Sequence, residues 1–199
     1  RDPLWSRGLG DVYKRQESFG QGMLLYTLTN KNGVTLKATD FGARIVALDV
    51  PLTKNESRSL VLGFPSADEY LSKDLYFGAT IGRTAGRIAD GSFELAGKKY
   101  QTMINTPTQT TLHGGTPGFE SKKWHSEIQE AQANPSVKFW LESPAGENGF
   151  PGNLTVSVTY TLTEENEWQI EYQATTDEQT LFNPCLLYTS DAADDMQCV

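Results

Sequence analysis

Hydrophobic and polar residues alternate along much of this 199-residue chain, which is the pattern of half-buried β-strands. The clearest example is the segment 154–162, LTVSVTYTL, in which an apolar side chain occupies every second position. The same alternation returns at residues 168–174, after the polar turn at residues 164–166, and predicts an antiparallel hairpin. The apolar side chains of the first strand are therefore expected to face the core.

Shorter segments of the same kind predict further strands at residues 24–29, 34–39, 44–50, 60–62, 93–95, 99–103 and 136–142. The turn dipeptides Asn32-Gly33 and Ala96-Gly97 each separate two of these strands. The one helix signal is a capping box, in which Ser66 precedes Glu69 by three residues, and it predicts no more than one or two turns. Together these patterns predict an all-β fold, for which a β-sandwich is the economical architecture.

The alternation stops near both ends of the chain. Residues 1–16 (RDPLWSRGLGDVYKRQ) and 185–199 (CLLYTSDAADDMQCV) show no strand or helix period. We interpret both segments as non-native sequence, of the kind produced when a reading frame runs into adapter or vector DNA; the alternative is two disordered tails. We therefore expect the domain to span residues 17–184.

Composition narrows the range of partners. Lys and Arg number 17 against 25 Asp and Glu, and a net charge of −8 argues against a nucleic-acid or anionic-membrane surface. No apolar run approaches the ~20 residues of a membrane-spanning helix. The cysteines, Cys185 and Cys198, both lie in the last segment, which excludes a disulfide scaffold and leads us to expect a cytoplasmic location.

The two histidines differ in their surroundings. His113 lies in the segment TLHGGTPGF, where glycines let the backbone approach a ligand closely and a ring nitrogen can meet a ligand oxygen. The alternative is an ordinary glycine-rich turn with a solvated histidine. His125 is expected at the surface of a strand. Two histidines twelve residues apart with no cysteine nearby do not form a zinc site, so no metal is predicted.

Two arginines lie in a second glycine-rich segment, GATIGRTAGRIADG. Arg87 is a candidate for forked hydrogen bonds to sugar hydroxyls or a carboxylate, with pairing to an acid such as Asp90 as the equal alternative. Arg83 is expected to be structural. Glu147 is a candidate acid in the loop SPAGENGFPGN, although a solvated turn residue is the favoured interpretation. The chain has neither a phosphate-binding GxxxxGK[ST] loop nor a GxSxG nucleophile elbow.

Several segments, taken in order, resemble the aldose 1-epimerase (galactose mutarotase) family. They are FGARIVALDVP, LVLGF, YFGATIGRTAGRIADGSFELAGKKY, LHGGTPGF, SPAGENGFPGNLTVSVTYTLT and EYQATTDEQTLFNP. The resemblance implies a β-sandwich of the galactose mutarotase-like (supersandwich) type, roughly twice as long as residues 17–184, of which this chain is an N-terminal fragment. It also implies interconversion of the α and β anomers of aldohexoses such as glucose and galactose.

The mechanism that the resemblance implies needs no cofactor. A carboxylate takes the proton of the anomeric hydroxyl and a histidine protonates the ring oxygen, so that the ring opens and closes again on the other face. In this sequence Arg87 matches the family's sugar-contacting arginine. Gly86 stands where many members have a sugar-contacting asparagine, which removes one hydrogen bond. His113 matches a histidine that lies against the sugar and has a supporting catalytic role.

The family's principal acid belongs to an N-H-x-Y-F-N motif that is expected shortly after Pro184, and its carboxylate base follows later. Neither motif occurs in the chain, so we expect this polypeptide to be inactive. Two alternatives remain, and the first keeps Arg87 and His113 as binding residues. One is a non-catalytic carbohydrate-binding β-sandwich. The other is a relative acting on sugar phosphates, which would call for more basic residues around the site.

Overall fold

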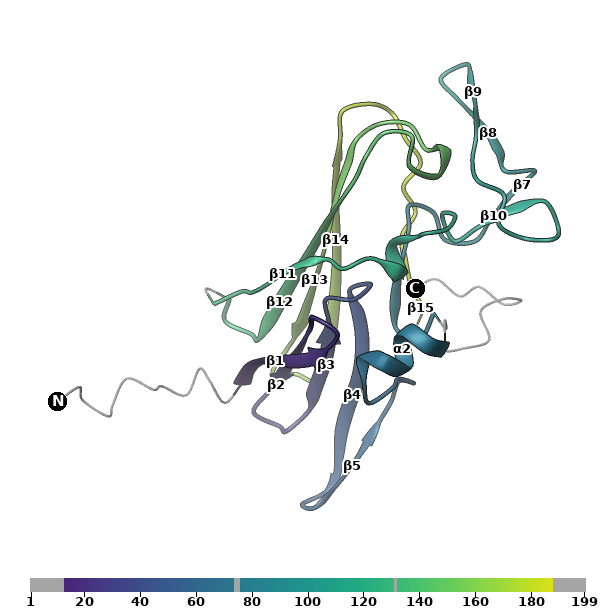
Figure 1. Ribbon diagram of the computed structural model, residues 1–199. Coiled ribbons are helices and arrows are strands. Elements are labelled where there is room, and N and C mark those ends of the chain that lie inside the picture. The colour runs from purple at the N-terminus through teal and green to yellow at the C-terminus, as the bar shows by residue number, and fades with distance from the viewer. Residues whose placement is uncertain (1–12, 74–75, 131, 188–199) are drawn as a thin grey trace.

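The structure is a computed structural model that describes residues 13–73, 76–130 and 132–187 and shows two antiparallel sheets packed face to face (Figure 1). The first sheet has the order β1-β2-β3-β4-β5 and the second has the order β11-β12-β13-β14. Their strands are β1 (Lys14–Gly20), β2 (Met23–Thr29), β3 (Thr35–Thr39), β4 (Arg44–Thr53), β5 (Glu56–Ser59), β11 (His125–Ile128), β12 (Ser136–Ser143), β13 (Leu154–Leu162) and β14 (Trp168–Thr176).

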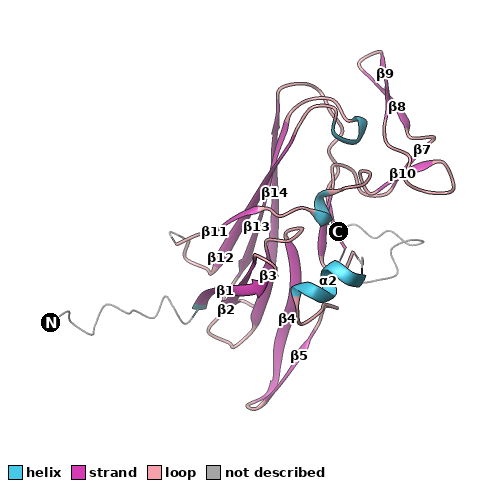
Figure 2. Cartoon of the chain, viewed as in Figure 1, coloured by secondary structure: helices cyan, strands magenta, loops and turns pink. Residues whose placement is uncertain are grey.

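Smaller pairs of strands complete the described part of the chain. They are β6 (Ala79–Ile81) with β15 (Cys185–Leu187), β7 (Arg87–Ala89) with β10 (Thr110–Leu112), and the hairpin of β8 (Ser92–Leu95) and β9 (Lys98–Gln101). Strands predominate in the described residues (Figure 2), beside the short helix α2 (Ala67–Lys73) and the 3₁₀ turns η1 (Phe119–Ser121) and η2 (Glu147–Gly149). The β7–β10 and β8–β9 pairs lie together at one end of the molecule (Figure 1).

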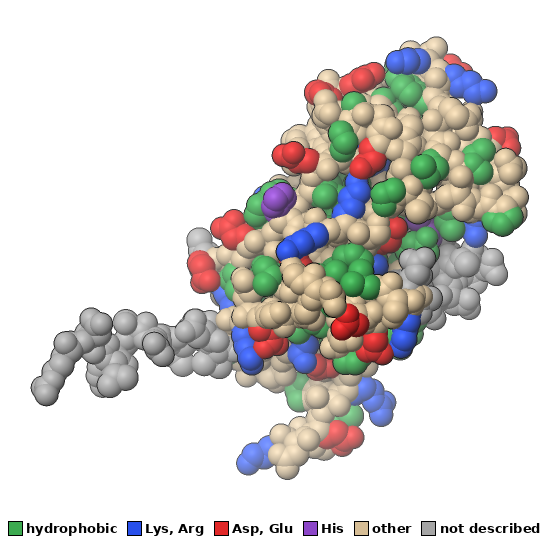
Figure 3. All heavy atoms as spheres, viewed as in Figure 1, with side chains coloured by type: hydrophobic (Ala, Val, Ile, Leu, Met, Phe, Trp, Pro, Cys, Tyr) green, Lys and Arg blue, Asp and Glu red, His purple; other side chains and the backbone are tan. Residues whose placement is uncertain are grey.

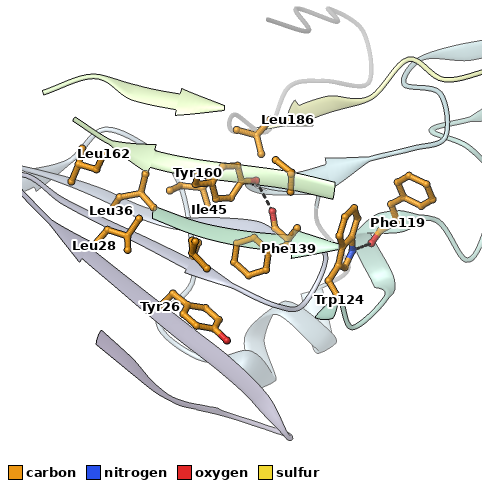
Figure 4. Packing of buried hydrophobic residues seen from close by; sticks show 14 of the residues in the cluster. Tyr26, Leu28, Leu36, Ile45, Phe119, Trp124, Phe139, Tyr160, Leu162 and Leu186 are labelled. Carbon is orange, nitrogen blue, oxygen red and sulfur yellow. Dashed lines mark hydrogen bonds between the residues drawn. The ribbon is translucent and has the colours of Figure 1, made fainter. Parts of the chain in front are cut away.

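The core lies between the two sheets. Tyr26, Leu28, Leu36 and Ile45 of the first sheet meet Phe139, Tyr160 and Leu162 of the second (Figure 4). The buried Tyr160 hydroxyl donates a hydrogen bond of 2.6 Å to the carbonyl oxygen of Ala43, so its polar atom has a partner inside the core. The opposite face of the first sheet is covered by α2, in the cluster Met23, Leu25, Phe41, Val46, Ala67 and Tyr70.

Most predicted strands are confirmed, and their alternation correctly predicts which side chains face the core. The five apolar side chains of β13 that were expected in the core are each at most 2% exposed. The similar pattern in β14 leaves Ile170 37% exposed, because β14 pairs with β13 alone among the described strands. Ser66 caps α2 as predicted, by accepting a hydrogen bond of 3.4 Å from the Glu69 amide.

Three strand predictions are wrong. Residues 60–62 are not a strand, because β5 uses residues 56–59 to form a hairpin with β4. Residues 14–16 and 185–187, expected to lack strands, belong to β1 and β15, and Leu186 packs into the core (Figure 4). The β1 sequence KRQESFG has no apolar alternation, and the three residues of β15 are too few to show a period, which explains the two misses. The interpretation of the chain ends as non-native stays a prediction, and residues 1–12 and 188–199 lie outside the described ranges.

The surface carries charged side chains of both signs (Figure 3). Acidic and basic side chains are interspersed on the face of the molecule seen in Figure 3. Within the described ranges, no helix has both the length and the apolar character required to cross a membrane.

Candidate functional site

The β7–β10 ladder brings Arg87 and His113 together. The two strands are antiparallel, with Arg87 opposite Leu112, so that His113 directly follows the ladder partner of Arg87. The Arg87 side chain is exposed, whereas the His113 side chain is only 2% exposed. The two residues that the sequence indicated as a pair, 26 positions apart in the chain, therefore lie close together in the fold.

Gly86 and His113 hold each other through two hydrogen bonds. The His113 amide donates to the Gly86 carbonyl oxygen at 2.9 Å, and the Gly86 amide donates to His113 Nδ1 at 3.2 Å. Because Nδ1 accepts a hydrogen bond, the proton of a neutral ring resides on Nε2. His113 therefore presents Nε2–H as a hydrogen-bond donor. Gly86 takes part through its backbone, which the sequence analysis did not foresee.

The loop after β10 depends on glycine. His113 itself has a φ of 53°, and it is followed by Gly114 and Gly115 with φ of 82° and 93°. A Cβ atom at position 114 would lie 2.2 Å from the carbonyl oxygen of Gly82, which is far inside van der Waals contact. Glycine is thus required at Gly114 both by backbone conformation and by the close approach of the two loops.

Burial makes His113 a neutral residue. Its ring packs edge-on against Tyr76, with ring centroids 5.0 Å apart and an angle of 67° between the planes. Burial, and to a smaller extent the positive charge of Arg87, lowers the pKa of His113 to about 4. At neutral pH the side chain is therefore an uncharged donor beside a charged arginine. It does not act as an acid of matched pKa.

This shift predicts how stability depends on pH. Between pH 6.5 and about 4 the unfolded chain binds a proton at His113 that the folded chain does not, so stability falls as the pH falls through this window. The loss amounts to about 3 kcal/mol, at up to about 1.4 kcal/mol per pH unit. Urea denaturation of the wild type and of His113→Asn across this range isolates the effect, because asparagine does not titrate. Parallel stability curves for the two proteins would contradict the assignment.

Two asparagines hold the His113 loop through side-chain hydrogen bonds. Asn105 Oδ1 accepts a hydrogen bond of 2.7 Å from the Leu112 amide, and its Nδ2 donates to the Leu112 carbonyl at 3.0 Å. Asn148 Nδ2 donates to the carbonyl oxygens of Gly114 and Pro117, both at 2.9 Å. Sequence reasoning missed both residues. The signal for Asn148 was its place between Glu147 and a glycine, since asparagine tolerates the φ of 48° found there.

Arg83 is structural, as expected. Its guanidinium is buried and donates to the hydroxyls of Ser143 and Thr180 and to the carbonyl oxygens of Ser143, Pro144, Pro151 and Gly152. Burial lowers the pKa of Arg83, and the charges of Glu147 and Asp177 oppose this shift. Arg83 therefore ties the loop before β7 to the loop before β13.

Glu147 is not the solvated turn residue that the sequence favoured. It forms an ion pair with Lys122 and accepts a hydrogen bond from the Ser143 hydroxyl, so it belongs to the polar network around Arg83. Its partners are supplied by the fold of the loop and are not visible in the sequence. His125 lies at the surface of β11 as predicted, stacked on Trp140 at 5.4 Å and away from the β7–β10 ladder.

Comparison with known proteins gives the same family throughout. A family model described as "Aldose 1-epimerase" matches residues 24–186. The chain is 42% identical to the aldose 1-epimerase of Haemophilus influenzae over 159 residues, covering 80% of this chain and 45% of that protein. It is 41% identical to the galactose mutarotase of Sus scrofa over 143 residues, covering 72% of this chain and 40% of that protein.

Solved structures agree with the sequence comparison. The crystal structure of galactose 1-epimerase from Lactobacillus acidophilus superposes with a TM-score of 0.74 at 27% identity, over 87% of this chain and 50% of that one. The predicted all-β class and the likeness to galactose mutarotase folds are therefore confirmed. The chain spans about half the length of the curated relatives it matches.

Proposed function

Because the chain belongs to the aldose 1-epimerase family, we propose that Arg87 and His113 form part of a pyranose-binding site for free aldohexoses. This proposal rests on one observation. The β7–β10 ladder places an exposed arginine next to a neutral histidine donor at its end. The guanidinium offers forked donors to vicinal sugar hydroxyls. Nε2–H of His113 offers a single, fixed donor to a sugar oxygen.

The charge state of His113 limits its part in anomer interconversion. Ring opening needs one group that takes a proton from the anomeric hydroxyl and one that gives a proton to the ring oxygen. A histidine with a pKa of about 4 is unprotonated at neutral pH and cannot supply that proton. We assign His113 the supporting task of holding the sugar and polarising an oxygen. The backbone amide of Gly86 donates to Nδ1 of His113 and so holds the ring in its Nε2–H tautomer.

This assignment predicts that the 199-residue chain binds sugar without accelerating mutarotation. Its other histidine, His125, stacks on Trp140 in the second sheet and is not part of the ladder site. Polarimetry of fresh α-D-glucose is expected to give the same rate with and without the chain. An acceleration that disappears in His113→Asn would contradict the supporting role and show that the chain itself is active.

A binding measurement with matched variants tests the site itself. Galactose is expected to shift backbone amide signals of residues 86–87 and 112–115 in NMR spectra. Arg87→Met removes the forked donors at an exposed position and is expected to weaken binding about tenfold or more. Arg58→Met, at an exposed position of β5, is the control and should leave the affinity unchanged. Equal affinities for the two variants would refute the role of Arg87.

A further inference from the structure

The second sheet carries an aromatic side chain on its outward face. In β12, Val137, Phe139 and Leu141 point into the core, so the intervening Lys138 and Trp140 point away from it. Trp140 lies in a row of directly paired positions across all four strands: His125, Trp140, Ser157 and Gln173. Across the strands, the aromatic pair of His125 and Trp140 is thus followed by the Ser157 hydroxyl and the Gln173 amide.

His125 fixes the indole from one side. The two rings stack at 5.4 Å with 21° between their planes. Beside Trp140 is an open hollow of about 350 Å³, lined by Glu127, Lys138, Trp140, Thr155, Ser157, Gln173, Ala174 and Thr175. His125 does not line this hollow, and most of the lining comes from β13 and β14. One face of the indole therefore stacks on His125, and the other face borders the hollow.

The lining selects a class of ligand. Glu127 and Lys138 lie opposite each other in the β11–β12 register and contribute −1 and +1, so the lining has no net charge to attract an ion. The remaining polar groups are the hydroxyls of Thr155, Ser157 and Thr175 and the amide of Gln173, which both donate and accept hydrogen bonds. The flat indole of Trp140 and the neutral polar groups that line the hollow with it suit a sugar ring, which has an apolar face and hydroxyl groups around its edge.

We propose that the hollow beside Trp140 is a second carbohydrate-binding site, which takes a neutral pyranose unit of an oligosaccharide. The C–H face of the sugar packs on the indole, and its hydroxyls bond to Ser157, Gln173 and Thr155. The site lies on β11–β14, whereas Arg87 and His113 belong to the β7–β10 ladder, so the two bind sugar independently. The open hollow admits an internal unit of a longer saccharide as well as a terminal one.

The test is NMR titration of the 199-residue chain with cellohexaose, maltohexaose and galactotetraose. At least one of them is expected to shift the Trp140 indole signal and the amides of β13 and β14 around Ser157 and Gln173. Trp140→Ala is expected to weaken that binding about tenfold or more. Failure of all three saccharides to bind, or an unchanged affinity in Trp140→Ala, would overturn the proposal.

Matched variants keep the test decisive if Trp140→Ala does not fold. Gln173→Ala and Gln169→Ala remove the same side chain from exposed positions of the same strand, but only Gln173 lines the hollow. Only Gln173→Ala is expected to weaken binding, by about threefold or more. His113→Asn should leave this binding unchanged, which separates it from the ladder site. Equal effects of the two glutamine variants, or loss of binding in His113→Asn, would refute the second site.

Discussion

Replacement of Arg83 by methionine is expected to lower the free energy of unfolding by about 3–5 kcal/mol. Arg83 is 2% exposed, and its guanidinium bonds to four carbonyl oxygens and two hydroxyls. Methionine preserves much of the apolar stem but leaves these buried acceptors without their donor, and each unsatisfied acceptor costs about 1–3 kcal/mol. Urea denaturation followed by tryptophan fluorescence measures the loss.

The exposed Arg58 of β5 provides the control for this substitution. Arg58→Met makes the same chemical change at the surface and is expected to alter stability by no more than about 0.5 kcal/mol. The Arg83 variant should also lose the attachment between the loop before β7 and the loop before β13, and with it the affinity for galactose. A loss of stability below about 1 kcal/mol would mean that the network around Arg83 is not formed in solution.

Replacement of Phe139 by alanine is expected to cost about 3–5 kcal/mol, because it opens a cavity between the two sheets. The Phe139 ring is fully buried and meets the rings of Tyr26 and Tyr160 edge-on, at centroid distances of 5.6 Å and 5.7 Å. The contact with Tyr26 joins the second sheet to the first, and the contact with Tyr160 lies within the second sheet (Figure 4). Thermal and urea unfolding of the variant both report the change.

The neighbouring residue makes this a test of register as well as of packing. Lys138 points to the opposite face of β12, so Lys138→Ala is expected to change stability by no more than about 0.5 kcal/mol. A shift of β12 by one residue would exchange the two faces. A larger loss in Lys138→Ala than in Phe139→Ala would therefore contradict the pairing of β12 with β13.

The sequence predicted the fold best where strands are long. The alternation in β13 extends over nine residues and correctly placed its apolar side chains in the core. The pattern in β14 is equally clear, but the sequence does not show that β14 lies at the edge of the described sheet, where Ile170 is partly exposed. Strands of three residues, such as β6, β7 and β15, are shorter than any detectable period and are defined by the partners they find in the folded chain.

The candidate site was predictable in part. Glycine clusters indicated the loops of Arg87 and His113, because glycine permits left-handed backbone and close contacts between loops. The sequence did not reveal that Gly86 would fix the tautomer of His113 through its amide, or that Tyr76 would bury the ring. It also did not indicate the bracing asparagines, Asn105 and Asn148, since their contacts depend on how distant loops meet.

The central claim is that a neutral His113, protonated at Nε2, lies beside Arg87 and contacts an aldohexose. Long-range ¹H–¹⁵N NMR of the histidine side chains tests it most directly. An Nε2–H tautomer is expected to persist as the pH falls toward about 4, and galactose is expected to shift the signals of His113 but not those of His125. A ring protonated at Nδ1, a titration near the ordinary histidine pKa of about 6.5, or no response of His113 to galactose would contradict it.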